Sequence, residues 1–308
     1  MKVDVMTTAA PLPRIQELAR SAQQAGIDGL VVTEAGRTAY LSCAAAALAA
    51  PGIDLATGIA VAFPRSPMVT AATAWELAEV SQGRFRLGLG TQVKAHIERR
   101  YSMTFDRPGP RLREYVQATR AIFRAFAGEE KLDFHGEFYE HTLLPGQWAP
   151  GPIDVPAPAI DIAAVNPWML RMAGEVADGV HVHPLNSPTY LRETALPSIA
   201  EGAAKAGRAP DEIQLIVPCF TVVGDTEEEK ARWRDLARMQ VSFYGSTPNY
   251  AFIFEQLGHD GTTERLRERQ KAGDVAGMAQ QISDDLLQHF VVESDWDGAA
   301  DAIHARDD

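Results

Sequence analysis

The sequence predicts an α/β fold of the TIM-barrel class, (β/α)8, and three observations lead to this prediction. Short apolar runs alternate with helix-like segments along most of the chain. The runs are apolar on both faces, as expected of parallel strands that helices cover. The chain of 308 residues also has the length of a closed eight-stranded barrel. The alternative is an open doubly wound sheet, which normally carries a phosphate loop after its first strand, and Thr7–Pro11 is not such a loop.

Seven segments have the length and composition of strands. The eighth strand is uncertain, because it is either the weak run Phe290–Val292 or absent from this sequence. The seven expected strands are residues 3–6, 29–33, 55–63, 85–89, 159–164, 180–183 and 213–223.

Helices are expected between these strands, from helical spacing of apolar residues and from end signals. Pro13 opens the first helix and Gly26 ends it, Ser66 is the expected N-cap of the third, and Asn166 caps the helix after the fifth strand. The expected helices are residues 13–25, 40–50, 67–80, 112–126 and 167–177. A further helix of about twenty residues is expected before the seventh strand, and most of the chain beyond residue 225 is expected to be helical.

Residues 91–158 interrupt the alternation of strands and helices after the fourth strand. They comprise a long polar connection up to residue 111, a strong helix, a hairpin that should turn at His135–Gly136, and a proline-rich loop. Regular alternation resumes at Ala159, so we interpret this segment as an insertion. The sequence therefore predicts one domain over residues 1–308.

Composition limits the partners and the compartment. The formal charge of -12 argues against nucleic acid as a partner. No run approaches the roughly 18 apolar residues of a membrane helix, and the first residues lack the pattern of a signal peptide, so we expect a cytoplasmic protein. Cys43 and Cys219 are far apart in sequence, and neither a disulfide framework nor a metal site is indicated.

The stretch Gly83–Gln92 is the best candidate for a strand that ends at a binding site. Its apolar residues alternate with Arg86 and Gly88, as in a strand. A loop that a ligand can approach closely is expected to begin at Gly90. The third glycine of the dinucleotide fingerprint is missing, because Val93 follows Gln92. A ligand here is therefore not expected to bind in the Rossmann manner.

Several motifs resemble one enzyme family. Thr57–Pro67 and Glu79–Gly90 are similar to the bacterial-luciferase-like (LLM) flavin and deazaflavin oxidoreductases, and more particularly to the branch that uses coenzyme F420. Phe134–Tyr139 and Gly174–Val180 support the resemblance, which spans roughly residues 1–290. It implies a β/α barrel with insertions, whose site lies at the carboxyl ends of the strands.

The resemblance also implies positions for the cofactor. In the F420 branch a non-proline cis peptide, here Gly58–Ile59, forms a bulge behind the deazaflavin ring, although an ordinary buried strand is the structural alternative. The loops after the fourth and fifth strands would contact the ring, its linker or its phosphate, and for Asn166 a plain helix cap is the alternative. The cofactor-binding candidates are Gly58, Ile59, Gly90, Thr91, Gln92, Ala164, Val165 and Asn166.

Three residues are candidates for proton delivery: His183, Glu34 and His96. Glu34 follows Thr33 where the family often carries a polar pair at the end of the second strand. His181 and His183 alternate on the sixth strand, so one should point into the barrel, and His183 is nearer its carboxyl end. A hydrogen-bonded structural histidine is the alternative.

The connection after the fourth strand is basic. Residues 94–113 hold six Lys and Arg against two Asp and Glu, a local charge of +4 in an acidic chain. Such a segment suits the phosphodiester and oligoglutamate tail that the resemblance implies for the cofactor. The alternative is a solvated face, or a subunit contact, paired with acidic neighbours.

The resemblance implies an F420-dependent oxidoreductase that moves a hydride between the deazaflavin C5 and a small, apolar organic substrate, in a family-like homodimer. Members that oxidise sugar phosphates carry a histidine and a glutamate where this chain has Ala35 and Val93, so that activity is not expected. Two alternatives stay open: an FMN-dependent monooxygenase of the same family, and a non-catalytic cofactor-binding barrel.

Overall fold

The computed structural model describes residues 1–307, which fall into two compact units. The first unit comprises residues 1–164, 171–181 and 202–215, and the second holds the rest of the described chain. No helix described between residues 1 and 307 is long and apolar enough to cross a membrane.

A mostly buried sheet forms the centre of the first unit. Its strands follow the path β1-β2-β3-β5-β8-β9-β10, and β4 pairs with β5 after β3 has ended. The pairings from β1 to β8 are parallel, so the carboxyl ends of these strands lie along one edge. The strands are β1 (Asp4–Thr8), β2 (Gly29–Thr33), β3 (Asp54–Thr57), β4 (Ala60–Val61), β5 (Phe85–Gly90), β8 (Ala159–Ala164), β9 (Gly179–Val182) and β10 (Gln214–Ile216).

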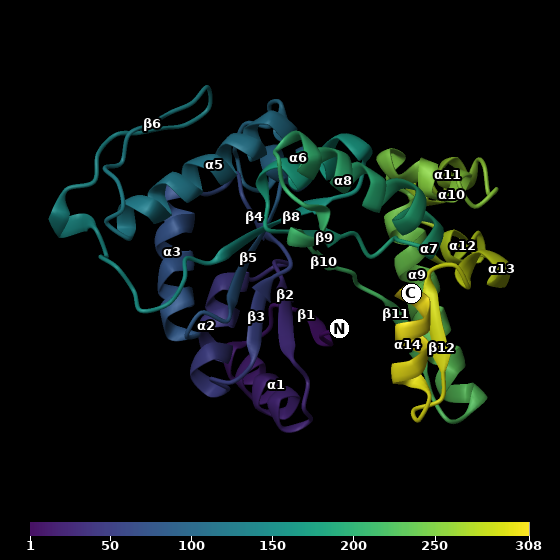
Figure 1. The fold of residues 1–308 in the computed structure, drawn as a ribbon. Coiled ribbons are helices and arrows are strands. Elements are labelled where there is room, and N and C mark those ends of the chain that lie inside the picture. The colour runs from purple at the N-terminus through teal and green to yellow at the C-terminus, as the bar shows by residue number, and fades with distance from the viewer. Residues whose placement is uncertain (308) are drawn as a thin grey trace. The chain divides into compact units, whose positions relative to one another are not determined.

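Helices pack against this sheet and against one another: the helix at residues 12–24 contacts that at 39–49, which contacts that at 67–80, which in turn contacts that at 108–126 (Figure 1). Ile15, Ala19 and Ala22 form the buried stripe of the first helix, and the side chain of Ser66 caps the third by accepting from Val69 N at 3.3 Å. The helices that lie wholly in the first unit are α1 (Leu12–Gln24), α2 (Ala39–Ala49), α3 (Pro67–Val80), α4 (Lys94–Arg99) and α5 (Pro108–Phe126). Two more, α6 (Pro167–Val176) and α8 (Leu196–Lys205), have residues in both units.

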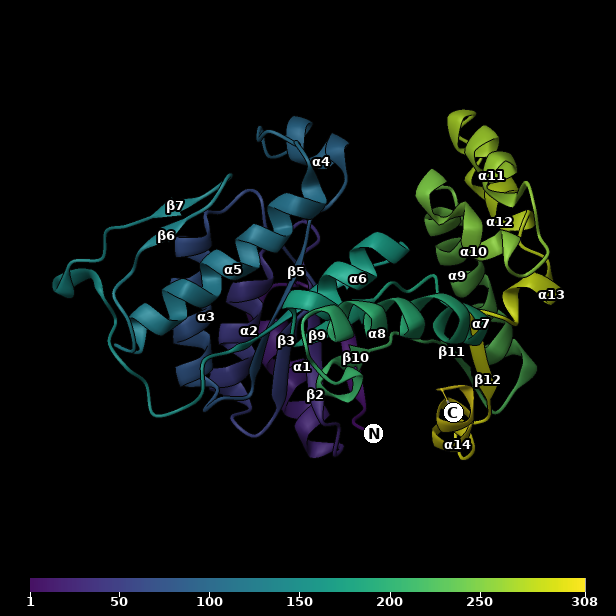
Figure 2. The ribbon, with the colours of Figure 1, turned by 45° about the horizontal axis from the view of Figure 1, so that its top comes forward.

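The segment between β5 and β8 differs in two details from the sequence prediction. The polar connection contains the short helix α4, and the hairpin of β6 (Phe134–His135) and β7 (Glu140–His141) turns through residues 136–139 instead of at His135–Gly136 (Figure 2). Glu114 of α5 explains the wider turn, because its carboxylate accepts from the backbone N–H of residues 137–139 at 2.7–2.8 Å. The long-range partner was not visible in the local sequence.

The expected seventh strand, residues 213–223, is wrong as a single element. It divides into β10 and β11 (Phe220–Val223), with Pro218 between them, and a proline has no N–H for a ladder. The weak run near residue 290 does form a strand, β12 (Val291–Ser294), which pairs in parallel with β11 in a separate sheet. Within residues 1–307 the main sheet runs from β1 to β10 without pairing its two ends, so an eight-stranded closure is not seen.

The second unit is mostly helical. Its longest helix begins with a capping box, in which Thr226 Oγ1 accepts from Glu229 N at 3.2 Å, and it packs against β11. Phe254 and Phe290 form a buried edge-to-face pair at 5.7 Å in its core. The helices are α7 (Pro188–Tyr190), α9 (Glu227–Gly245), α10 (Ala251–Glu255), α11 (Thr262–Lys271), α12 (Val275–Gln280), α13 (Asp284–Leu287) and α14 (Ala299–Asp307), together with a π-helical turn at 191–195 and a 3-10 turn at 248–250. Two further 3-10 turns, at 146–148 and 210–212, belong to the first unit.

Candidate functional site

A β-bulge interrupts the third strand near the carboxyl edge of the sheet. Ala56 pairs with Arg86, and Ala60 pairs with Leu89, so three residues of one chain segment face only two residues of β5. The bulge consists of residues 57–59, and its Gly58–Ile59 peptide bond is cis, as the resemblance implies. Gly58 and Ile59 are only partly buried, which leaves this backbone accessible to a ligand.

The end of β2 holds the bulge by hydrogen bonds. Thr33 Oγ1 donates to the carbonyl of Gly58 at 2.8 Å, and the backbone N–H of Glu34 donates to the carbonyl of Ile59 at 3.3 Å. The N–H of Gly58 itself donates to Val32 O at 2.8 Å. The polar pair at the end of the second strand therefore positions the bulge, a role that sequence reasoning did not identify.

The Glu34 side chain ties the residues after the bulge to an arginine. Its Oε2 accepts from Val61 N at 2.7 Å, and the two oxygens accept from the guanidinium of Arg65 at 3.0 and 2.5 Å. Arg65 also lies over the ring of Tyr40, at 5.0 Å from its centroid. Glu34 is 7% exposed, so its carboxylate is mainly occupied by these hydrogen bonds to Val61 and Arg65.

Two glycines allow close packing at the bulge, and neither position has space for a side chain. A Cβ at Gly58 would lie 2.2 Å from Val31 Cγ1, and a Cβ at Gly90 would lie 2.8 Å from the Ile59 side chain. Ile59 thus packs over the end of β5, where Gly90 accepts a hydrogen bond from Ala62 N at 3.0 Å. The backbone at residues 58 and 90 is therefore packed closely against neighbouring side chains at the bulge.

The loop after β5 leaves this surface through Thr91 and Gln92, which are partly buried. Gln92 has a left-handed backbone (φ 57°), and its side-chain oxygen accepts from Val93 N at 2.9 Å. The loop then enters α4, on which His96 is exposed to solvent. The structure thus brings Gly58, Ile59 and Gly90 together, with Thr91 and Gln92 directly following.

The candidates after β8 have local structural roles. Ala164 is buried at the end of the strand. In the second unit, Val165 O accepts from Tyr190 OH at 2.6 Å, and Asn166 Oδ1 accepts from Met169 N at 3.0 Å. The expected N-cap at Asn166 is therefore confirmed, while a phosphate at the start of α6 stays a prediction.

His183 lies just beyond β9, which ends one residue earlier than expected. Its Nδ1 accepts from Leu185 N at 3.0 Å, so the hydrogen of the neutral ring is on Nε2. The rings of Tyr244 and Tyr250 lie 4.7 and 4.6 Å from it, within the second unit, and burial lowers the pKa of His183 to about 4. His183 is therefore a neutral hydrogen-bond donor near pH 7. Its contacts with the two tyrosines could not be predicted, because these residues are distant from it in sequence.

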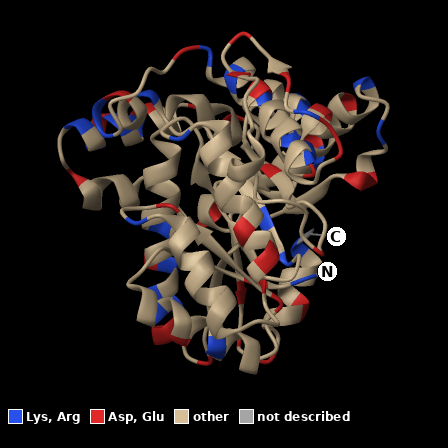
Figure 3. Cartoon of the chain, turned by 90° about the vertical axis from the view of Figure 1, so that its left-hand side faces the viewer, with Lys and Arg blue, Asp and Glu red and all other residues tan. Residues whose placement is uncertain are grey.

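The basic segment is partly engaged within the first unit. Arg107 pairs with Glu137 at 2.5 Å, Arg113 pairs with Glu175 at 2.6 Å, and Arg111 lies over the ring of Phe63. Lys94, Arg99 and Arg100 remain exposed at α4 and its end. Figure 3 shows basic and acidic residues interspersed along much of the chain.

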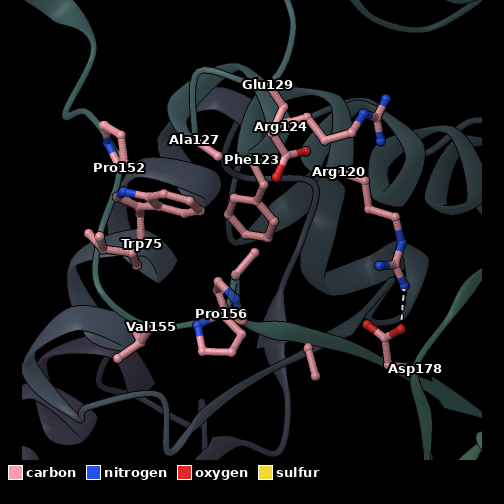
Figure 4. Close-up of a pocket in the computed structure, with 14 residues that line it drawn as sticks. Trp75, Arg120, Phe123, Arg124, Ala127, Glu129, Pro152, Val155, Pro156 and Asp178 are labelled. Atoms are coloured by element: carbon pink, nitrogen blue, oxygen red, sulfur yellow. Dashed lines mark ion pairs between the residues drawn. The ribbon is translucent and has the colours of Figure 1, made fainter.

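A cavity of about 600 Å³ lies elsewhere in the first unit (Figure 4). Trp75, Phe123 and Pro156 line it, and the ion pair of Arg120 and Asp178, at 2.8 Å, closes one side. It lies at the amino-terminal ends of β8 and β9, whereas parallel α/β sheets bind ligands at the carboxyl ends of their strands. We therefore place the candidate site at the bulge, despite the size of this cavity.

Among residues 1–307, no group of three or more His, Cys, Asp or Glu side chains is arranged to hold a metal.

Comparison with known proteins identifies the family. The sequence profile described as luciferase-like monooxygenase matches residues 1–308. An uncharacterized protein of Mycobacterium tuberculosis is 38% identical over 295 residues, which cover 96% of this chain and 87% of that protein. The 5,10-methylenetetrahydromethanopterin reductase of Methanolobus tindarius is 30% identical over 291 residues, covering 92% and 83%.

Solved structures share the fold. The coenzyme F420-dependent tetrahydromethanopterin reductase of Methanopyrus kandleri superposes with a TM-score of 0.78 at 22% identity, covering 98% of this chain and 89% of that chain. A type II Baeyer–Villiger monooxygenase of Pseudomonas putida, in complex with FMN, gives a TM-score of 0.66 at 17% identity, covering 99% and 88%. This chain belongs to the luciferase-like monooxygenase family.

Proposed function

We propose that this protein is an oxidoreductase that uses coenzyme F420 to transfer a hydride to or from a small organic substrate. One observation carries the proposal: an accessible bulge at the carboxyl edge of the sheet, held by Thr33 and Glu34 and bordered by two glycines. Side chains at residues 58 and 90 would collide with Val31 and Ile59, and so would displace the backbone that we assign to the ring. The similarity to methanopterin reductases supports F420.

The residues present fit this cofactor. Gly58 and Ile59 would back the ring, and residues 90–92 would border it. The exposed cations Lys94, Arg99 and Arg100 suit an anionic tail. The start of α6 suits a phosphate less well than the sequence predicts, because Pro167 has no N–H and Asn166 Oδ1 already accepts from Met169 N. When bound, coenzyme F420 supplies a hydride acceptor or donor at C5.

The three candidates for proton delivery differ in what their surroundings permit. Glu34 is engaged by Arg65 and Val61, and His96 is exposed on α4. His183 is neutral near pH 7 and presents its Nε2 hydrogen, so it can polarise an oxygen atom by hydrogen bonding without being an imidazolium. We therefore favour His183 among the three.

FMN is the alternative cofactor, because a monooxygenase with bound FMN has a similar fold. The bulge offers backbone and apolar surface to a tricyclic ring, and both cofactors carry such a ring. Titration of the purified protein with F420 and with FMN, followed by fluorescence, separates the two. Tighter binding of FMN would overturn the proposal, and absence of turnover with reduced F420 over a panel of ketones, enones and alcohols would favour a non-catalytic barrel.

Two alanine variants test the position of the site. Gly58→Ala should weaken F420 binding at least tenfold, because its Cβ would meet Val31 at 2.2 Å and displace the bulge. Gly146→Ala is the matched control, since a Cβ there meets nothing within 4 Å. Equal affinities of the two variants would show that the ring lies elsewhere.

We also propose a homodimer. The uncharged helix α2 exposes Leu41 and Leu48, with 58% and 72% of their surface accessible, and both lie on one side of the helix. Sedimentation of wild type and of Leu48→Glu tests this: we expect a dimer that the glutamate dissociates, and an unchanged dimer would move the interface away from α2. Leu143→Glu, at a 77% exposed loop position, is the control.

A further inference from the structure

A buried charged cluster lies on three strands of the first unit, directly beside the bulge. Asp161 of β8 is fully buried and accepts two hydrogen bonds from the guanidinium of Arg86 on β5, one of them at 2.8 Å from Nε. His181 of β9 is 4% exposed, and its Nε2 lies 3.7 Å from Asp161 Oδ2, which is too far for a hydrogen bond. Within residues 1–307, this buried Nε2 has no hydrogen-bond partner.

The His181 ring occupies space that two glycines leave open. A Cβ at Gly88 would lie 2.6 Å from its Nε2, and a Cβ at Gly58 would lie 3.4 Å from its Cε1. Thr57, between them, joins β3 to β5 through its hydroxyl, which donates to Gly88 O at 2.8 Å and accepts from Gly88 N at 2.9 Å. The imidazole therefore packs against the bulge where the bulge meets β5.

We infer that His181 is a positioning residue, whose imidazole ring supports the bulge at Gly58 and so holds the backbone on which the cofactor ring rests. This inference rests on the proposed function, because the bulge is there assigned to the cofactor. His181 acts through Gly58 and not by contact with the substrate. Among the described residues no hydrogen bond holds the ring through Nε2, so on that side its position depends on packing against the bulge and β5.

Protonation should disturb this support. Burial lowers the pKa of His181, Asp161 acts in the opposite direction, and Arg86 acts in the same direction as burial. Among the described residues, Asp161 and Arg86 are the charged groups that act on the ring from the neighbouring strands, and Gly58, Gly88 and Val31 contribute no charge. A proton on His181 would form an ion pair with Asp161 and draw the ring away from Gly58, so cofactor binding should weaken in acid.

Two variants separate the volume of the ring from its charge. His181→Phe keeps a ring that cannot be protonated, and His181→Ala removes the support. We expect the affinity for F420 at pH 7 to change less than threefold in His181→Phe and to fall at least tenfold in His181→Ala. Between pH 7 and pH 5, the affinity of wild type for F420 should fall at least threefold more than that of His181→Phe. Any titration of the cofactor itself affects both proteins equally and does not change this ratio.

The outcomes distinguish this inference from the proposed function. If wild type binds F420 and His181→Ala binds equally well, or if His181→Phe loses as much as His181→Ala, the inference is wrong and the proposed function stands. If wild type binds neither F420 nor FMN, the proposed function fails. The inference is then decided by the amide NMR signals of Gly58 and Ile59 in the cofactor-free protein, which should shift in His181→Ala and stay near their wild-type positions in His181→Phe. Unshifted signals in His181→Ala would overturn it.

Discussion

Glu34 and Arg65 form a two-pronged ion pair beside the bulge, with oxygen–nitrogen distances of 2.5 and 3.0 Å. The Glu34 side chain is 4% exposed and that of Arg65 is 21% exposed, so water screens this pair only weakly. Because Glu34 also accepts from Val61 N, the pair fixes the chain directly after residues 58–60. The ion pair thus links the end of β2 to the segment that carries the candidate site.

Glu34→Gln should lower the free energy of unfolding by about 2–4 kcal/mol, because it leaves the largely buried guanidinium of Arg65 without a counter-charge. Urea unfolding at pH 7 measures this loss. Glu17→Gln is the control, since Glu17 pairs with Arg14 at an exposed site and should lose at most about 0.5 kcal/mol. Similar losses in the two variants would show that the pair of Glu34 and Arg65 does not stabilise the fold.

Thr33→Val removes the hydroxyl that holds the bulge and keeps the shape of the side chain. The carbonyl of Gly58 then loses its partner, so we expect a loss of about 1 kcal/mol in stability and a threefold to tenfold weaker affinity for F420. Thr73→Val in α3, where the hydroxyl bonds within the helix to Val69 O, is the matched control. A cofactor affinity that falls equally in both variants would contradict a role for Thr33 at the bulge.

Local patterns were enough to predict most of the first unit. The expected and observed bounds agree for Pro67–Val80 and for Ala159–Ala164, because caps and apolar runs are encoded in neighbouring residues. The division of the seventh strand was missed, since the apolar composition of residues 213–223 outweighed the signal of Pro218.

The candidate site was predicted less completely. The resemblance led to the cis bond at Gly58–Ile59, but the partners of the bulge come from other strands, and no local pattern joins Arg65 to Glu34. His183 was preferred to His181 from position along the strand alone. The structure instead places His181 against Gly58. This contact depends on how three strands align, so it could not be predicted from the local sequence.

His183 should make stability depend on pH. Its pKa is lowered to about 4 in the folded protein, whereas an unfolded histidine titrates near 6.5. Above pH 6.5 both states are neutral and stability is unaffected; as the pH falls from 6.5 towards 4, only the unfolded chain takes up the proton, so the folded state loses stability. Since the ring keeps some contact with solvent, we expect about 1–2 kcal/mol rather than the full value.

Urea unfolding of wild type and His183→Gln at pH 7 and pH 5 measures this dependence. The glutamine can still accept from Leu185 N and does not titrate, so its loss between the two pH values should be smaller than that of wild type. Equal losses would show that His183 is not the group that titrates.

The exposed cations at the end of α4 should attract the anionic tail of F420. Replacing Arg99 and Arg100 together by glutamine should weaken binding threefold to tenfold at low salt, and the difference should disappear near 1 M salt, where charges are screened within about 3 Å. Replacing Arg14 and Arg20 on α1 removes the same charge at exposed positions and is the matched control. Equal effects of the two double variants would indicate that the net charge of the protein, and not a contact at α4, attracts the cofactor. No effect of the α4 variant would place the tail elsewhere. A loss confined to that variant and abolished by salt would locate the tail at α4.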